Sequence, residues 1–120
     1  MKRINTPNSI KIYDDSGKIL LEISAKFDDG VMIMKIDGDL TSEVSHDFED
    51  ELFAILTVAD KIDIDLENVG YISSLSLRAL LSAQQIIDKK DGTRLRIINM
   101  KKEVYKTFKE QGFSELFIIG

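Results

Sequence analysis

At the centre of the chain, residues 61–90 read KIDIDLENVGYISSLSLRALLSAQQIIDKK, and this segment is the most informative about the fold. Apolar and charged residues alternate over residues 61–66, which is the period of a strand. From Leu77 onward, apolar residues recur at the spacing of an amphipathic helix. The stretch therefore predicts a strand, a short loop and a helix that begins near residues 74–76 and ends at the Asp-Gly pair that follows.

The alternation of elements continues on both sides of this stretch. Thr41 and Ser42 are good N-cap residues, and a helical pattern of apolar residues follows them. Beyond the central helix, residues 95–98 read as a strand, residues 101–110 as a short helix and residues 117–119 as a final short strand. Alternating strands and helices require crossover connections, so we expect a largely parallel segment in the sheet.

The first third of the chain has a different pattern. Apolar runs at residues 10–13 and 19–24 flank an Asp-Asp-Ser-Gly turn, which predicts a β-hairpin. A second turn leads into another strand over residues 31–36. Residues 1–9 are polar and contain a proline, so we expect a flexible tail there. Residues 10–120 are then one domain, in keeping with the length of the chain.

Composition excludes several kinds of function. The 120 residues include no cysteine and only one histidine, which excludes disulfides, thiolate metal sites and multi-histidine metal sites. The formal net charge of −5 has the wrong sign for a broad nucleic-acid-binding face. No apolar run is long enough to cross a bilayer, and no signal peptide is visible. We therefore expect a cytoplasmic protein that binds no nucleic acid, is not inserted in a membrane and needs no metal or cofactor.

Three serines at the start of the central helix, Ser73, Ser74 and Ser76, are the most informative candidates for chemistry. A helix N-terminus has free backbone N–H groups and the positive end of the helix dipole, so a phosphate is stabilised there. One of these serines could accept a phosphoryl group. Serines at a helix start are more often simple N-caps, and spacing alone favours that interpretation.

For the other polar residues, the sequence favours structural roles over catalytic or metal-binding ones. His46 falls on a solvated helix face and has no Ser/Asp partners that would make a catalytic triad. Asp63 and Asp65 share one face of a strand, and we expect one of them to contact the backbone near the following loop. General acid–base catalysis by this pair is the less favoured interpretation. The two Asp-rich turns do not continue as EF-hand loops, and no glycine-rich nucleotide-binding motif is present.

Four stretches, in order and at the right spacing, resemble the STAS domain of bacterial anti-sigma factor antagonists. They are GDLT at 38–41, residues 62–69, YISSLSLRALL at 71–81 and VYKTFKEQGFSELFII at 104–119. The resemblance covers residues 25–119 and implies an α/β fold, a mixed sheet of four to six strands flanked by helices. The hairpin at residues 10–24 is an addition that could extend the sheet, cover an edge strand or build a dimer contact.

The resemblance also implies a function. A protein of this kind is not an enzyme: it binds a serine-kinase anti-sigma factor, which carries the ATP, and it is released when the kinase phosphorylates one serine. Ser74 occupies the position of the acceptor serine. A phosphate brings nearly two negative charges into the contact surface, so the complex would dissociate. The residues expected at the partner surface are Thr41, Ser73, Leu75, Ser76 and Arg78.

The chain departs from the family pattern at this site. Thr41 and Ser73 stand where the family has aspartates, and Leu75 and Ser76 replace a Ser/Thr and a glycine. These changes favour a second hypothesis, a STAS scaffold or transport-system subunit that docks without being phosphorylated. A third, an enzyme or small-molecule binder, has the least support in the residues. The sequence names no sigma factor, kinase or signal, and it leaves homodimer formation open.

Overall fold

The computed structural model describes all of residues 1–120 and places seven strands in one sheet, in the order β1-β2-β3-β4-β5-β6-β7. The elements are β1 (Lys2–Asn5), β2 (Ser9–Tyr13), β3 (Ile19–Asp28), β4 (Val31–Asp37), the 3-10 turn η1 (Ser42–Val44), α1 (Ser45–Leu56), β5 (Lys61–Asn68), α2 (Ser74–Asp88), β6 (Arg94–Ile98), α3 (Lys102–Glu110) and β7 (Ile118–Ile119). β1 to β4 pair antiparallel, whereas β4 to β7 pair parallel. The predicted mixed α/β fold, with its hairpin and its parallel segment, is confirmed.

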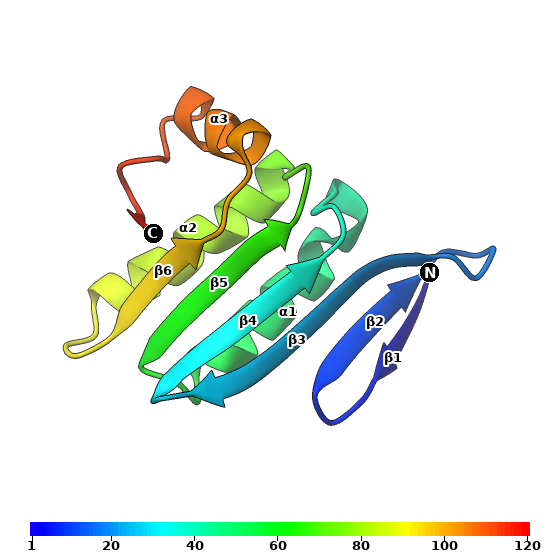
Figure 1. Ribbon diagram of the computed structural model, residues 1–120, viewed down its shortest axis with the longest axis horizontal. Helices are drawn as coiled ribbons and strands as arrows, with labels where there is room; N and C mark the ends of the chain where they lie inside the picture. Colours follow the sequence, from blue (N-terminus) through cyan, green and yellow to red (C-terminus); the bar gives the residue numbers. More distant parts are fainter.

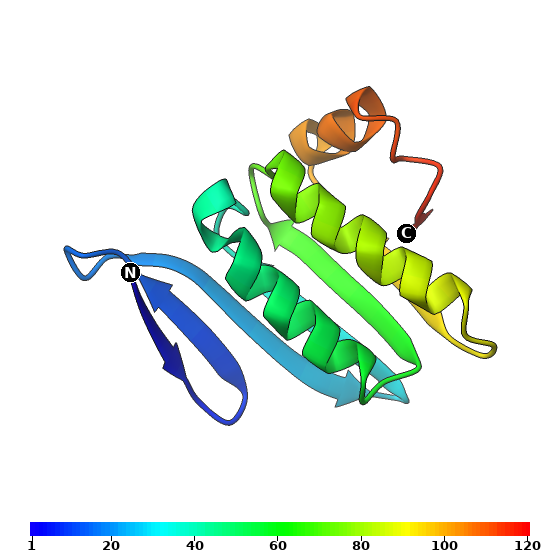
Figure 2. The same ribbon diagram turned by 180° about the vertical axis from the view of Figure 1, so that it is seen from behind.

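The helices cover only one face of the sheet. α1 and α2 lie side by side against that face, and the opposite face carries no helix (Figures 1 and 2). α3 lies beyond the carboxyl end of β6, at the same end of the sheet as the start of α2. The loops that follow β4, β5 and β6 therefore meet at one edge, which is where parallel α/β sheets bind their partners.

The N-terminal segment departs from the prediction of a flexible tail over residues 1–9. Lys2–Asn5 forms β1, which pairs with β2 and adds a strand to the sheet, so that seven strands replace the expected four to six. The guanidinium of Arg3 also donates to Asp47 Oδ1 at 3.1 Å and to Glu51 Oε1 at 2.6 Å. Both acceptors lie on α1, far from Arg3 in the sequence, so the composition of residues 1–9 could not indicate these contacts.

Strand β3 joins the predicted hairpin to the rest of the sheet. It runs from Ile19 to Asp28 and pairs with β2 along one edge and with β4 along the other. The expected division between a hairpin at 10–24 and a core that starts at residue 25 therefore falls inside one continuous strand. The hairpin is an extension of the same sheet.

The core lies between the sheet and its two helices. Alternate residues of the central strands, such as Ile64 and Ile97, are fully buried and face α1 and α2. Phe48 of α1 and Leu80 of α2 fill the space between the layers and are likewise 0% exposed. Fully burying one such side chain contributes about 1.5–3 kcal/mol, so this layer is the main source of stability.

The uncovered face of β5 holds a buried carboxylate. Asp63 is 5% exposed and accepts hydrogen bonds from Arg94 Nη1 at 2.8 Å and Arg96 Nη2 at 2.7 Å. Burial alone would raise the pKa of the Asp63 carboxyl, but the hydrogen bonds and charges of Arg96 and Arg94 outweigh burial and hold this pKa below its usual value. Asp63 in turn raises the pKa of Arg96. The carboxylate therefore ties β5 to β6.

Asp65, two residues further along β5, behaves differently. Its Oδ1 accepts a hydrogen bond from the backbone N–H of Glu67 at 3.0 Å. This contact confirms the prediction that one carboxylate of the pair meets the backbone near the following loop.

Candidate functional site

The loops after β4 and β5 are held together by backbone hydrogen bonds. The N–H of Leu40 donates to the carbonyl of Tyr71 at 2.9 Å, and the N–H of Ser73 donates to the carbonyl of Leu40 at 2.8 Å. Leu40 and Ile72 form an isolated parallel bridge, and both side chains are buried. The start of α2 is therefore fixed by the neighbouring loop as well as by its own sequence.

A side chain adds a further link between the two loops. Asp39 Oδ1 accepts a hydrogen bond from the backbone N–H of Gly70 at 3.1 Å. This role of Asp39 was not predicted from the sequence, where its position two residues after the end of β4 was the only available signal.

Two of the three candidate serines are buried inside this junction. Ser73 is the N-cap of α2, and its Oγ accepts a hydrogen bond from the N–H of Ser76 at 3.2 Å. Ser73 Oγ donates to Ser76 Oγ at 3.2 Å, and Ser76 Oγ donates to the carbonyl of Leu40 at 3.3 Å. Ser73 is 2% exposed and Ser76 is 0% exposed. Both hydroxyls, which were expected at the partner surface, are therefore used within the loop in this structure.

Ser74, in contrast, is exposed as the first residue of α2. The N–H groups of a helix's first turn lack helical acceptors, so a negative charge on Ser74 would lie beside free donors and the positive end of the dipole. Arg78 is also exposed and lies four residues further on, one turn along the same face. This is the best-placed anion position among the three serines.

Two apolar side chains close to Ser74 in the sequence are exposed. Leu75, the next residue, is 47% exposed, and Tyr71, on the preceding loop, is 54% exposed. Thr41 is half-buried on the adjoining loop, where it is the N-cap of η1 without a side-chain cap hydrogen bond. We call these residues, Thr41, Tyr71, Ser74, Leu75 and Arg78, the Ser74 surface. Apolar groups ringed by polar ones are typical of a protein-binding surface.

Replacing Ser73 with alanine should lower the free energy of unfolding by about 1–2 kcal/mol, because α2 loses its N-cap and the Ser76 hydroxyl loses a buried partner. The matched change Ser74→Ala should alter it by less than about 0.5 kcal/mol, since Ser74 is exposed. Urea denaturation of the two variants checks this difference. Equal losses would show that the cap is not where the structure places it.

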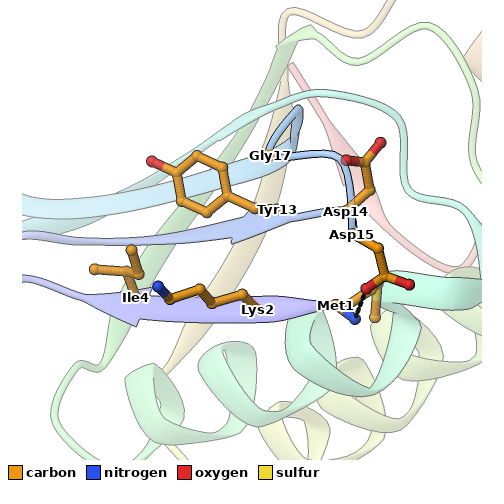
Figure 3. Close-up of a pocket in the computed structure, with 7 residues that line it drawn as sticks. All are labelled: Met1, Lys2, Ile4, Tyr13, Asp14, Asp15 and Gly17. Carbon is orange, nitrogen blue, oxygen red and sulfur yellow. Dashed lines mark hydrogen bonds and ion pairs between the residues drawn. The ribbon is translucent and has the colours of Figure 1, made fainter.

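A hollow lined by charged groups lies at the hairpin end of the molecule, remote in sequence from Ser74. It is about 430 Å³ and lies between β1 and the β2–β3 turn, lined by Met1, Lys2, Ile4, Tyr13, Asp14, Asp15 and Gly17 (Figure 3). Asp14 Oδ1 accepts from the Ser16 hydroxyl at 2.7 Å and from the Lys18 N–H at 2.9 Å. These bonds, led by the one from the Ser16 side chain, lower the pKa of Asp14. The Asp14 carboxylate therefore stabilises the turn between β2 and β3.

Two further features bear on the class of site. No group of three or more His, Cys, Asp or Glu side chains is arranged to hold a metal ion. No helix has the length and apolar character needed to cross a bilayer. His46 is exposed on α1, as expected, and its Nε2 lies 3.6 Å from Asp50 Oδ2.

Solved structures share this fold at low sequence identity. An anti-sigma factor antagonist from Mycobacterium paratuberculosis is 15% identical, with a TM-score of 0.75 over 90% of this chain and 89% of that one. The Bacillus cell fate determinant SpoIIAA, in its phosphorylated form, is 11% identical, with a TM-score of 0.62 over 82% and 90%. A sulfate transporter family protein from Wolinella succinogenes is 20% identical, with a TM-score of 0.64 over 96% and 87%.

Comparison by sequence identifies the family. The search against curated proteins found no match. The family model of the STAS domain matches residues 22–120, which is most of the chain and includes both loops of the junction and the Ser74 surface. The chain therefore belongs to the STAS domain family.

Proposed function

We propose that this protein is an anti-sigma factor antagonist that binds a serine-kinase anti-sigma factor through the Ser74 surface and is released by phosphorylation of Ser74. One observation carries the proposal: of three neighbouring serines, Ser73 and Ser76 are buried and only Ser74 is exposed. A serine kinase therefore meets a single exposed serine hydroxyl in this loop. The phosphorylated SpoIIAA structure, with the same fold, supports phosphorylation as the switch.

The position of Ser74 favours a switch that changes binding without unfolding the protein. A phosphate there brings nearly two negative charges, which the helix N-terminus and Arg78 partly offset, so the folded state tolerates it. The same phosphate would hold a shell of water close to the apolar side chains of Leu75 and Tyr71. A partner that packs against these side chains would have to remove this water. Binding is therefore the property that phosphorylation weakens.

The departure at Ser73 from the family's aspartate is compatible with this proposal. Ser73 acts as the N-cap of α2, and serine and aspartate are about equally good N-caps. The change therefore leaves the geometry of the Ser74 loop intact. Thr41 remains on the proposed surface as a neutral contact in place of an aspartate.

The test uses immobilised wild-type protein, Ser74→Ala and Ser74→Asp in a lysate of the native host, with bound proteins and Ser74 modification measured by mass spectrometry. We expect wild type and Ser74→Ala to retain a serine kinase, and Ser74→Asp to retain about tenfold less, which corresponds to about 1.4 kcal/mol. Added ATP should release the kinase from wild type and not from Ser74→Ala. Ser82→Asp, which adds the same charge two turns along α2, is the control and should bind as wild type does.

A second candidate function rests on the transporter-family neighbour, which aligns with 96% of this chain. In that case the protein is a docking subunit without a phosphoswitch. Retention of a transporter or scaffold subunit by wild type and Ser74→Asp alike, with no response to ATP, would support it and overturn the first proposal.

A further inference from the structure

The uncovered face of the sheet holds a hollow of about 620 Å³. This volume lies within the usual range of small-molecule pockets, about 300–1,000 Å³. Residues from three strands and the β1–β2 turn line it: Asn8, Ser24, Ala25, Lys26, Ile33, Lys35 and Asp65. No helix covers this face, so a ligand reaches the hollow directly from solvent (Figure 1).

The strand register brings its polar groups into one row. Ser24 of β3 pairs with Lys35 of β4, and Lys35 pairs with Asp65 of β5. Residues paired in this way point to the same face, so a hydroxyl, an ammonium and a carboxylate lie side by side across three strands. Lys26 and Ile33 form the adjoining pair, which adds a second ammonium and an apolar contact.

The two lysines of this hollow form no ion pair, unlike the arginines around Asp63. Neither Lys26 nor Lys35 takes part in any of the ion pairs of the structure. Asp65 is only 9% exposed, and its Oδ1 accepts from the Glu67 N–H. The second oxygen of this carboxylate accepts no hydrogen bond within the protein, and it keeps contact with solvent at the hollow that Asp65 lines. A free acceptor oxygen on a largely buried residue, beside two ammonium groups without ion-pair partners, is an arrangement that a ligand can complete.

We propose that this hollow binds a small hydroxylated organic anion, whose phosphate or carboxylate group lies between Lys26 and Lys35. The hydroxyl of the ligand donates to the free oxygen of Asp65. Ser24 and Asn8 offer further polar contacts at the rim, and Ile33 packs against the carbon skeleton. This site is separate from the Ser74 surface, and the proposal does not depend on phosphorylation of Ser74.

Titration of the full-length, isotope-labelled protein with glycerol 3-phosphate, malate and inorganic phosphate, followed by NMR, tests the site. We expect saturable shifts of the Ser24, Lys26, Lys35 and Asp65 amides with at least one of the two hydroxylated anions, and weaker binding of inorganic phosphate. Lys35→Gln should weaken binding about tenfold, because one of two charge-assisted contacts is lost. Lys26→Gln, on the neighbouring strand, should act in the same direction.

Lys90→Gln, an exposed lysine after α2, is the matched control and should leave binding unchanged. Shifts that fail to saturate by about 10 mM for both hydroxylated anions would overturn the site. So would an equal effect of Lys90→Gln and Lys35→Gln, since that would mean non-specific charge attraction. Inorganic phosphate binding as tightly as the hydroxylated anions would overturn the role of Asp65.

Discussion

Replacing Gly38 with alanine should lower the free energy of unfolding by about 3 kcal/mol or more. Gly38 has a φ of +122°, which L-residues rarely adopt, and a Cβ at this position would lie 2.5 Å from the carbonyl oxygen of Leu20 and 3.3 Å from the Cα of Leu21. Both are backbone atoms, so no rotamer change relieves the contact. Strand β3 would have to move away from the end of β4, at the base of the loop that holds the Ser74 junction.

Gly92→Ala is the matched control for this substitution. Gly92 also has a positive φ, +77°, but an added Cβ there meets no atom within 4 Å. We expect it to cost only about 1–2 kcal/mol, the strain of a left-handed backbone without a clash. Urea unfolding of the two variants therefore separates the clash from the strain. Equal losses would contradict the close approach of β3 to Gly38.

Replacing Asp63 with asparagine should lower the free energy of unfolding by about 2–3 kcal/mol. The change leaves Arg94 and Arg96 side by side without the carboxylate that both contact. Breaking a fully buried ion pair typically costs about 3–5 kcal/mol. The arginine side chains are 28% and 41% exposed, so water screens part of the remaining charge and the expected loss is smaller.

The same carboxylate predicts a pH dependence. The pKa of Asp63 is lower in the folded state than the unfolded value of about 3.9, so the unfolded state binds more protons as the pH falls. The contribution of the Asp63 carboxylate to the free energy of unfolding is therefore complete well above pH 4. It is lost as the pH falls through that value towards the folded pKa. Thermal unfolding between pH 7 and pH 3 should show a shallower acid decline for Asp63→Asn than for wild type. Asp91→Asn, in an exposed loop, should keep the wild-type slope, and a wild-type slope in Asp63→Asn would contradict the prediction.

Periodicity was sufficient to predict most of the fold. The period-two pattern of Lys61 to Leu66 and the helical pattern after Leu77 identified β5 and α2, and their alternation predicted the parallel segment. β1 was not predicted, because its four residues are all exposed and show no hydrophobic periodicity. Its position depends on Arg3 contacts with α1, which local sequence does not encode.

The sequence was sufficient to locate the candidate site at the start of α2 but not to assign a role to each serine. Three serines in four residues each suited a helix N-terminus, and only the backbone geometry decides that Ser73 is the cap. The burial of Ser76 depends on the carbonyl of Leu40, which lies 36 residues earlier in the chain. The hollow on the uncovered face depends on strand register, which sets Lys35 beside Asp65 and is invisible in either strand alone.

The identity between strand order and chain order has a consequence for how this protein folds. Each strand pairs with the strand made just before it, across a short turn in the antiparallel half of the sheet and across a helix in the parallel half. Short turns leave small loops to close, which favours fast pairing of β2, β3 and β4, whereas the parallel pairs close longer loops and form more slowly. The antiparallel half of the sheet, β1 to β4, can therefore form before the helices and parallel strands that follow it in synthesis are complete.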